Sequence, residues 1–235
     1  MIITSPHNEQ LKEVRKLNQR RRWRDRTGRF VAEGEDLLAA ADAAGWVPVL
    51  RLSAAGSGLA GTEVEAGLLH DASELGSGTR TLAVYEQRWA APAAGPLCVY
   101  LHGVHDPGNV GTVLRSAEAF GAGSVAIGPH TADPYGPKAV RASMGSVFTV
   151  ALHRGDDVAQ LPGPTVALVA DRGAALHELD LTTATLMIGA EREGLPEELV
   201  AAADHVARIP IASHSLNAAM AATVALYEAT RMART

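Results

Sequence analysis

Short apolar runs alternate with helical patterns along the second half of the chain. Six runs read as strands: PLCVYLHGV (96–104), SVAIG (124–128), VFTVALHR (147–154), TVALVAD (165–171), TLMIGA (185–190) and HVARIP (205–210). Helical periodicity begins at about 109, near 137, at 196 and again after the last of these runs. Alternating strands and helices predict an α/β fold with a mostly parallel sheet covered on both faces.

The first 90 residues predict a separate and smaller α/β unit. We expect helices over 8–24 and 35–44, and strands at FVAEG (30–34), WVPVLRL (46–52) and TLAVYEQ (81–87). The segment AAPAAGP (90–96) has no periodic pattern and is typical of a linker. The predicted organisation is therefore a domain over 1–90, a linker over 91–96 and a larger domain over 97–235.

Composition fits a globular protein with a sizeable core, since 47% of the 235 residues are hydrophobic and 20% are charged. No apolar run is long enough to cross a membrane, and the first residues lack the apolar core of a signal peptide. Cys98 is the only cysteine, so an internal disulfide is excluded and a buried structural thiol is favoured. We expect a cytoplasmic protein without a membrane partner.

Positive charge is concentrated in residues 1–30. This segment holds nine of the 21 Lys and Arg residues against three acidic ones, a local charge of +6 that leaves −11 for the rest of the chain. A basic segment on an acidic protein favours RNA phosphates as ligands, with Trp23 able to stack on a base. A solvated helix face, with Trp23 packed on its own domain, is the alternative. The candidate RNA-binding residues are Lys12, Arg15, Arg20, Arg21, Arg22, Arg24 and Arg29.

Three segments rich in Gly, Pro, Asn and Ser follow predicted strands. They are DPGNVGTVLRSAEAFG (106–121), LMIGAEREGLP (186–196) and IPIASHSLNAAMAATVALYEATR (209–231). Loops at the carboxyl ends of strands are where α/β proteins bind ligands. The three segments therefore predict one composite site.

Other ligand classes fit poorly. GAGSVA (121–126) has the spacing of a dinucleotide fingerprint, but it precedes a strand instead of following one, which disfavours an oxidoreductase. GAEREG (189–194) has the glycine spacing of a P-loop, with Leu195 where lysine belongs. His102 and His105 lack further ligands at metal spacing, so we expect no metal.

The three segments together resemble a known family. NVGTVLRSAEAFG resembles the first motif of the SpoU (TrmH-like) branch of the SPOUT RNA 2′-O-ribose methyltransferases. IGAEREGL and IPI…SLNAAMA are similar to its second and third motifs, in order, over about residues 97–232. TSPHNEQLKEVRKL followed by GRFVAEGEDLL resembles the family's ribosomal-protein-like RNA-binding domain. The resemblance implies a trefoil-knotted domain, S-adenosylmethionine as cofactor and a homodimer that completes the active site.

The same resemblance implies roles for particular residues. The catalytic candidates are Asn109, Arg115, Glu191, Ser215 and Asn217. Because a guanidinium is essentially always protonated, we expect Arg115 to clamp a phosphate and stabilise a developing alkoxide rather than act as a base. Alternatives remain: a surface pair of Arg115 with Glu118, and N-cap roles for Asn109 and Ser215.

The implied cofactor pocket uses backbone groups and apolar contacts from Ala170, Gly189, Ile209, Ile211 and Leu216. Residues 212–214 make the loop before SLN shorter than is usual in the family. The last helix carries an apolar stripe suited to a dimer contact or to packing within its own subunit: Leu216, Ala219, Met220, Thr223, Leu226 and Tyr227.

The predicted function is S-adenosylmethionine-dependent 2′-O-methylation of RNA. Large-subunit (23S) rRNA is favoured as substrate, because the added ribosomal-protein-like domain is typical of family members that act on it, including members that confer antibiotic resistance. The alternatives are a tRNA 2′-O-methyltransferase and a catalytically silent RNA-binding assembly factor.

Overall fold

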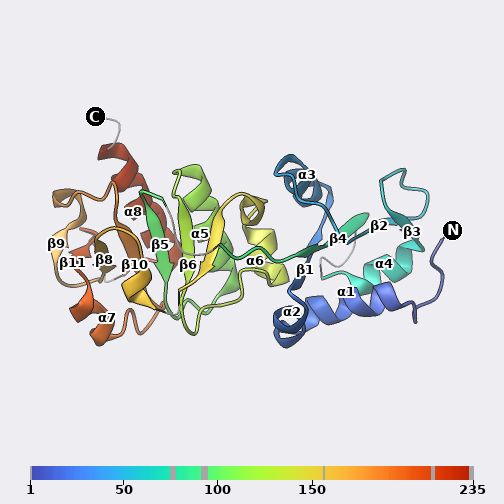
Figure 1. The fold of residues 1–235 in the computed structure, drawn as a ribbon, viewed down its shortest axis with the longest axis horizontal. Helices are drawn as coiled ribbons and strands as arrows, with labels where there is room; N and C mark the ends of the chain where they lie inside the picture. Colours follow the sequence, from blue (N-terminus) through green and yellow to red (C-terminus); the bar gives the residue numbers. More distant parts are fainter. Residues whose placement is uncertain (1, 75–77, 91–94, 156, 213–214, 233–235) are drawn as a thin grey trace.

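The chain forms two β-sheets placed end to end, with the N-terminus at one end and the C-terminus at the other (Figure 1). The structure is a computed structural model that describes residues 2–74, 78–90, 95–155, 157–212 and 215–232. The first sheet has the strand order β1-β4-β2-β3. Its strands are β1 (Arg29–Glu33), β2 (Leu50–Ala54), β3 (Thr62–Val64) and β4 (Thr81–Glu86). Strand β4 is antiparallel to both of its neighbours, whereas β2 and β3 are parallel.

The second sheet has seven strands in the order β7-β6-β5-β10-β8-β11-β9, and all six pairings are parallel. The strands are β5 (Cys98–Leu101), β6 (Ser124–Ile127), β7 (Ala151–Arg154), β8 (Thr165–Leu168), β9 (Ala174–Ala175), β10 (Thr185–Ile188) and β11 (His205–Arg208). The prediction of a mostly parallel α/β sheet is confirmed.

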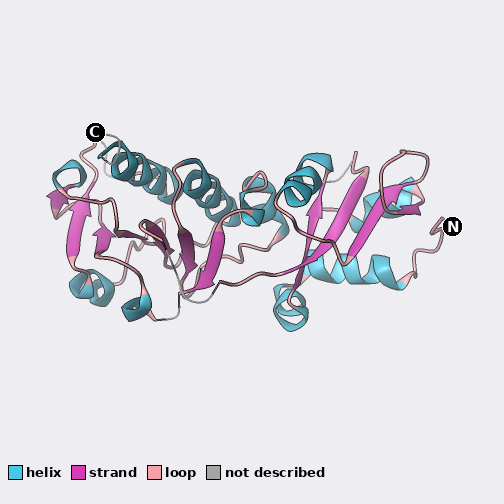
Figure 2. Cartoon of the chain, turned by 45° about the horizontal axis from the view of Figure 1, so that its top comes forward, coloured by secondary structure: helices cyan, strands magenta, loops and turns pink. Residues whose placement is uncertain are grey.

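Both faces of the seven-stranded sheet are buried, which explains its continuous apolar strands. Along β5, Val99 and Leu101 belong to one hydrophobic cluster, and Cys98 and Tyr100 belong to another. Helices cover both faces of the sheet (Figure 2). The helices of this half are α5 (Pro107–Ala119), α6 (Pro137–Ala142), α7 (Glu197–Ala202) and α8 (Ala218–Met232), with short 3-10 turns η1 (Ser146–Phe148), η2 (Val158–Gln160) and η3 (Leu176–Glu178).

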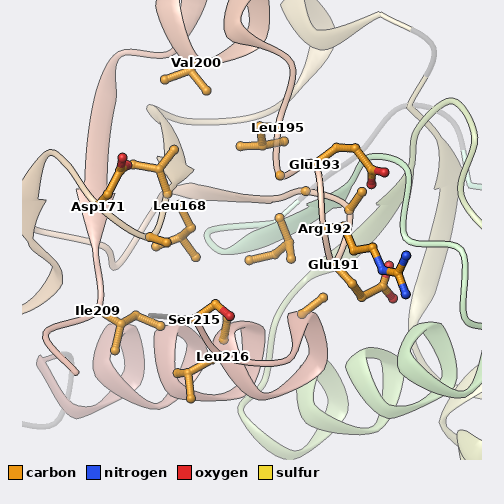
Figure 3. A pocket seen from close by; sticks show the side chains of 18 of the residues that line it. Leu168, Asp171, Glu191, Arg192, Glu193, Leu195, Val200, Ile209, Ser215 and Leu216 are labelled. Atoms are coloured by element: carbon orange, nitrogen blue, oxygen red, sulfur yellow. The ribbon is translucent and has the colours of Figure 1, made fainter. Parts of the chain in front are cut away.

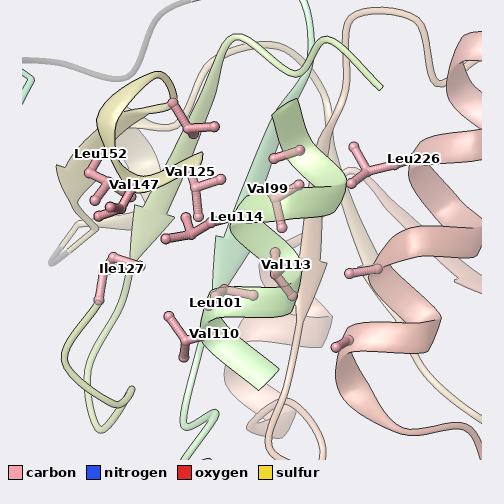
Figure 4. Packing of buried hydrophobic residues seen from close by; sticks show 14 of the residues in the cluster. Val99, Leu101, Val110, Val113, Leu114, Val125, Ile127, Val147, Leu152 and Leu226 are labelled. Atoms are coloured by element: carbon pink, nitrogen blue, oxygen red, sulfur yellow. The ribbon is translucent and has the colours of Figure 1, made fainter. Parts of the chain in front are cut away.

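Helix α5 is the centre of this packing. It begins where the Asp106 side chain accepts a hydrogen bond from the backbone N–H of Gly108 (2.7 Å) and where Pro107 occupies the first turn. Val110, Val113 and Leu114 then point from the helix toward β5 and β6 (Figure 4). The helix that carries Asn109 and Arg115 is therefore held firmly against the sheet.

The N-terminal helical segment differs from its prediction. Instead of one helix over 8–24, the chain forms α1 (Glu9–Gln19) and α2 (Arg21–Thr27), separated by Arg20 in an extended conformation. Helix α3 (Glu35–Ala43) matches its prediction, whereas α4 (Ala66–Ala72), β3 and β9 lie in stretches for which no element was predicted. Of the predicted linker, residues 91–94 lie outside the described residues, and Gly95 and Pro96 form a bend.

A single hydrophobic cluster runs from the first sheet into the second. It includes Phe30, Trp46 and Tyr85 from the N-terminal half and Tyr135 and Phe148 from the C-terminal half. The Phe30 and Tyr135 ring centroids are 4.7 Å apart, and the Trp46 Nε1–H donates a hydrogen bond to the Phe148 carbonyl (2.8 Å). The two halves are therefore packed together and not merely connected.

We expect Gly111→Ala to destabilise the protein, because α5 and α6 approach too closely there for any side chain. An added Cβ would lie 2.3 Å from the Ala139 carbonyl oxygen and 2.6 Å from the Ala142 Cβ. The expected cost is about 3 kcal/mol in the free energy of unfolding, measured by chemical denaturation.

The matched control is Gly67→Ala in α4, where an added Cβ meets nothing within 4 Å. A helical alanine without steric conflict is neutral or stabilises by up to about 1 kcal/mol. Equal destabilisation by the two substitutions would show that the contact between α5 and α6 is not the cause.

Candidate active site

The three predicted loops meet at the carboxyl ends of the parallel strands. The Asn109 side-chain amide donates a hydrogen bond to Glu191 Oε1 (2.7 Å), and the Asn217 amide donates one to Asn109 Oδ1 (3.1 Å). These residues are separated by 82 and 108 positions in the sequence. One side chain from each predicted motif therefore contributes to a continuous hydrogen-bond chain.

The outer members of this chain are fixed by their own backbone contacts. Asn217 caps α8, because its Oδ1 accepts hydrogen bonds from the backbone N–H groups of Ala219 (2.9 Å) and Met220 (3.3 Å). Its amide nitrogen is thereby directed toward Asn109. The alternative N-cap roles of Ser215 and Asn109 are incorrect, since Asn217 caps α8 and Asp106 caps α5.

Glu191 is held as a carboxylate. Burial by itself raises the pKa of Glu191, but the hydrogen bond from Asn109 opposes this effect. Backbone hydrogen bonds from Glu191 itself, His105 and Asp106 act in the same direction as Asn109, and the net pKa lies below its ordinary value. The site therefore carries a fixed negative charge at neutral pH.

A cavity of about 460 Å³ opens beside Glu191. It is lined by all five predicted cofactor residues, Ala170, Gly189, Ile209, Ile211 and Leu216, and by Glu191 and Ser215. Figure 3 shows Ile209, Ser215 and Leu216 on the side next to the final helix, with Leu195 and Val200 on the opposite side.

Asn109, Arg115 and Asn217 are not part of this lining. Ser213 and His214 of the shortened loop lie outside the described residues.

Gly189 is needed for the shape of the loop. A Cβ there would lie 2.2 Å from the Gly194 carbonyl carbon and from the Leu195 nitrogen. The loop is closed by two backbone hydrogen bonds between Ala190 and Gly194 (3.1 and 3.0 Å). Close backbone packing, as well as the cavity wall, therefore accounts for this glycine.

Sequence reasoning missed the charged residues of the cavity: Asp171, Arg172, Arg192, Glu193 and Glu197. The Arg172 guanidinium forms an ion pair with Glu197 Oε2 (2.6 Å), joining the end of β8 to the start of α7. Asp171 and Arg172 lie in the loop after a strand, and Arg192 and Glu193 lie within the second motif, so their positions were the available signal. Glu197 begins α7 and had no such signal.

The residues present fit S-adenosylmethionine. The volume lies within the range of small-molecule sites, and apolar walls from Leu168, Ile188 and Leu216 suit an adenine ring. Acidic side chains, among them Asp171 and Glu191, suit a ligand with a positive sulfonium and an ammonium group.

Arg115 lies on α5, and its side chain is exposed. Its alternative pairing with Glu118 does not occur, because Glu118 accepts hydrogen bonds from Ser146 Oγ (2.5 Å) and Thr149 Oγ1 (2.6 Å). Within the described ranges, Arg115 has no hydrogen bond or ion pair. It is available to a ligand from outside its own chain.

The predicted RNA-binding residues separate into two groups. Arg24 is buried, and its Nε lies 2.7 Å from Asp133 Oδ2, so the prediction that Arg24 contacts RNA is wrong. The remaining residues, Lys12, Arg15, Arg20, Arg21, Arg22 and Arg29, are exposed or half-buried. Trp23 is half-buried against the core of its own domain, as the alternative interpretation proposed, although it also lines a small surface cavity.

The apolar stripe of α8 also divides. Ala219 and Leu226 are buried, and Thr223 bonds to Ser116 of α5 through their hydroxyl groups (2.7 Å). Met220 and Tyr227 are more than half exposed, at 61% and 53%. One side of the helix therefore completes the core, and the other faces outward.

The described ranges show neither a metal cluster nor a membrane-spanning helix. They contain no group of three or more His, Cys, Asp or Glu side chains placed to hold a metal ion. None of their helices combines the length and apolar character needed to cross a membrane.

Comparison with known proteins agrees with this geometry. The SpoU rRNA Methylase family profile matches residues 96–227, and the MRM3-like substrate binding domain profile matches residues 8–88. The chain is 38% identical over 144 residues to the 23S rRNA (uridine(2479)-2′-O)-methyltransferase of Streptomyces viridochromogenes, an alignment covering 53% of this chain and 49% of that relative. It is 28% identical to the 23S rRNA (guanosine(2553)-2′-O)-methyltransferase RlmP of Bacillus subtilis, over 96% of this chain and 97% of that one.

A solved structure extends the agreement to the whole fold. The AdoMet-bound rRNA methyltransferase from Sinorhizobium meliloti superimposes with a TM-score of 0.87 at 30% identity, covering 99% of this chain and 98% of that one. The predictions of family, enzyme class and cofactor are thereby confirmed. The chain belongs to the SpoU rRNA methylase family of S-adenosylmethionine-dependent RNA 2′-O-methyltransferases.

Proposed function

We propose that this protein methylates a ribose 2′-hydroxyl of large-subunit (23S) rRNA in the cytoplasm, as a homodimer. Two relatives carry 23S rRNA in their names, and the substrate-binding profile, over residues 8–88, includes most of the basic segment 1–30. In this proposal residues 1–90 bind RNA, residues 97–235 form a knotted catalytic domain, and segment 91–96 links them.

One observation carries the proposal: the hydrogen-bond chain Asn217–Asn109–Glu191 lies beside a cavity of cofactor size. An unlinked set of motif residues would be compatible with an inactive scaffold. A linked set, with Glu191 ionised and Asn217 fixed at a helix start, is a preorganised polar site.

The residues have separate tasks in methyl transfer. Bound S-adenosylmethionine supplies an electrophilic methyl group on a sulfonium. The attacking ribose oxygen bonds to the methyl carbon as the carbon–sulfur bond breaks, and the hydroxyl proton passes to solvent water. Negative charge develops on the oxygen because loss of the proton runs ahead of bond formation. Arg115 holds the adjacent phosphate and stabilises this charge. Asn109, Glu191, Ser215 and Asn217 keep the loops in register and align the two reacting groups.

The homodimer accounts for the position of Arg115. It lies outside the cavity lining of its own chain, on the helix that packs against α8. The exposed side chains Met220, Val224 and Tyr227 lie four and three residues apart on α8 and so share one face. A second copy docked on this face brings Arg115 to the cavity of that copy.

The decisive experiment is transfer of labelled methyl from S-adenosylmethionine to 23S rRNA and, separately, to bulk tRNA. We expect label on 23S rRNA that remains in an alkali-resistant dinucleotide. Label on tRNA alone would overturn the substrate, and cofactor binding without label on naked rRNA or ribosomal particles would favour the silent assembly factor.

Replacing Arg115 by alanine should reduce methyl transfer by about 100-fold or more, the cost of losing one charge-stabilising group. S-adenosylmethionine affinity by calorimetry should change less than about twofold, because Arg115 is assigned to the RNA phosphate and the ribose oxygen and not to the cofactor. Arg80→Ala, which removes a surface guanidinium paired with Glu35, is the control. Comparable activity of the two variants would exclude the proposed role.

The lowered pKa of Glu191 makes its contribution to stability depend on pH. The carboxylate contributes fully above its ordinary pKa of 4.5, and the contribution is lost as the pH falls through the lower folded-state value. The difference in unfolding free energy between wild type and Glu191→Gln should therefore be constant at neutral pH and shrink below 4.5. A difference that grows on acidification would contradict this assignment.

Val224→Glu should convert the dimer to a monomer in light scattering, because it places a charge within the apolar face of α8. Methyl transfer should fall in parallel. Val47→Glu introduces the same change at a position that is 82% exposed in the N-terminal half, and it should leave the dimer intact. An unchanged dimer in Val224→Glu would place the interface elsewhere.

A further inference from the structure

A second cavity lies on the basic N-terminal segment, away from the cofactor site. Its volume is about 330 Å³, and it is lined by Arg20, Arg22, Trp23 and Arg26. Three guanidinium groups and one indole around a hollow form a surface suited to an anion carrying a flat ring.

The ion pairs of this segment set these arginines apart from their neighbours. Lys12 pairs with Glu9 (2.7 Å), and Arg29 pairs with Glu13 (2.9 Å). Arg21 lies 3.7 Å from Asp25, and Arg15 donates to the Pro6 carbonyl oxygen (2.8 Å). By contrast, the part of the chain that the structure describes offers no acidic partner to the three arginines of the cavity: Arg20, Arg22 and Arg26. Like Lys16 and Arg15, they have no ion pair within the described residues, and these three uncompensated charges line one cavity.

Trp23 supplies a stacking surface within this cavity. The Arg26 guanidinium carbon lies 3.9 Å from the centre of the Trp23 ring, and Lys16 Nζ lies 4.6 Å from it. Nucleic-acid bases stack on both aromatic rings and guanidinium planes. Because the Arg26 guanidinium lies over the Trp23 ring, a base placed against it would extend this arrangement, and Arg20 and Arg22 line the same cavity and can contact phosphates.

The opposite side of α2 fixes the cavity relative to the active site. Arg24 forms the buried ion pair with Asp133 and also donates to the Leu17 carbonyl (2.6 Å). Arg21 donates to the Thr131 carbonyl (3.2 Å). Thr131 and Asp133 lie between β6 and α6, and α6 packs on α5, which carries Asn109. These contacts connect the segment that carries the cavity, through α6, to the helix that carries Asn109.

We propose that Arg20, Arg22, Trp23 and Arg26 form a binding site for one unpaired RNA nucleotide, with its phosphates on the arginines and its base on the Arg26–Trp23 pair. This site deepens the proposed function, on which it rests, by naming single-stranded RNA as the anchored element. The target ribose then lies at a fixed distance from the anchored nucleotide.

The test measures RNA affinity without methyl transfer. The probes are a labelled single-stranded RNA 12-mer, its duplex and 23S rRNA, each over a range of salt concentrations. The variant Arg20→Ala/Arg22→Ala/Arg26→Ala is compared with Lys12→Ala/Arg15→Ala/Arg29→Ala, which removes the same charge from residues that already have partners. S-adenosylmethionine affinity and the unfolding midpoint show that each variant is folded.

We expect the cavity variant to weaken binding of single-stranded RNA about 100-fold. The slope of log affinity against log salt concentration should become shallower by about 2, because each of the three lost phosphate contacts contributes roughly 0.7. The comparison variant should weaken binding less than about fivefold. Equal losses in the two variants, or equal affinity of the wild type for the strand and its duplex, would overturn the proposal.

Tryptophan emission provides a second readout. RNA should quench the emission of the wild type, and Trp23→Phe should lose that quenching while it keeps a ring for packing. Quenching unchanged in Trp23→Phe would overturn the role of Trp23. RNA binding through the cavity without any methyl transfer would support this site and refute the proposed function. Methyl transfer by the wild type, with equal losses of RNA affinity in both charge variants, would support the proposed function and refute this site.

Discussion

The side-chain amide of Asn109 is the interaction on which the active site depends. It accepts a hydrogen bond from Asn217 and donates one to Glu191, so it uses both polarities of a single group. A carboxylate at this position could not donate, and a hydroxyl or an aliphatic group would not reach both partners. Because each partner belongs to a loop that lines the cavity, this amide sets the register of the cavity walls.

Much of this architecture could be predicted from local patterns, because the parallel strands are buried on both faces and their loops converge at one edge. Asn109, Glu191 and Asn217 could be named in advance only because their motifs resemble those of a known family. The ion pair between Arg24 and Asp133 could not, since it joins positions 109 residues apart. No local pattern distinguishes Arg24 from Arg22, because burial is decided by which face of α2 meets the other half of the protein.

The N-terminal helical segment shows the same limit. Its composition is helical throughout, yet the chain is extended at Arg20 and restarts as α2. The restart turns Arg24 toward the protein and leaves Arg20, Arg22 and Arg26 around Trp23. Helix propensity is a weak prior that tertiary contacts override. In this protein those contacts bury Arg24 and leave Arg20, Arg22 and Arg26 at the surface, around a cavity.

The aromatic cluster between the two sheets bears on how such a protein can evolve. Phe30, Trp46 and Tyr85 share one core with Tyr135 and Phe148 of the other half. Either half taken alone would expose its own apolar contact surface, and an N-terminal half from a distant relative would not match the surface of this C-terminal half. Substitutions on the outer side of α2 leave this shared core intact, whereas exchange of a whole half would disrupt it.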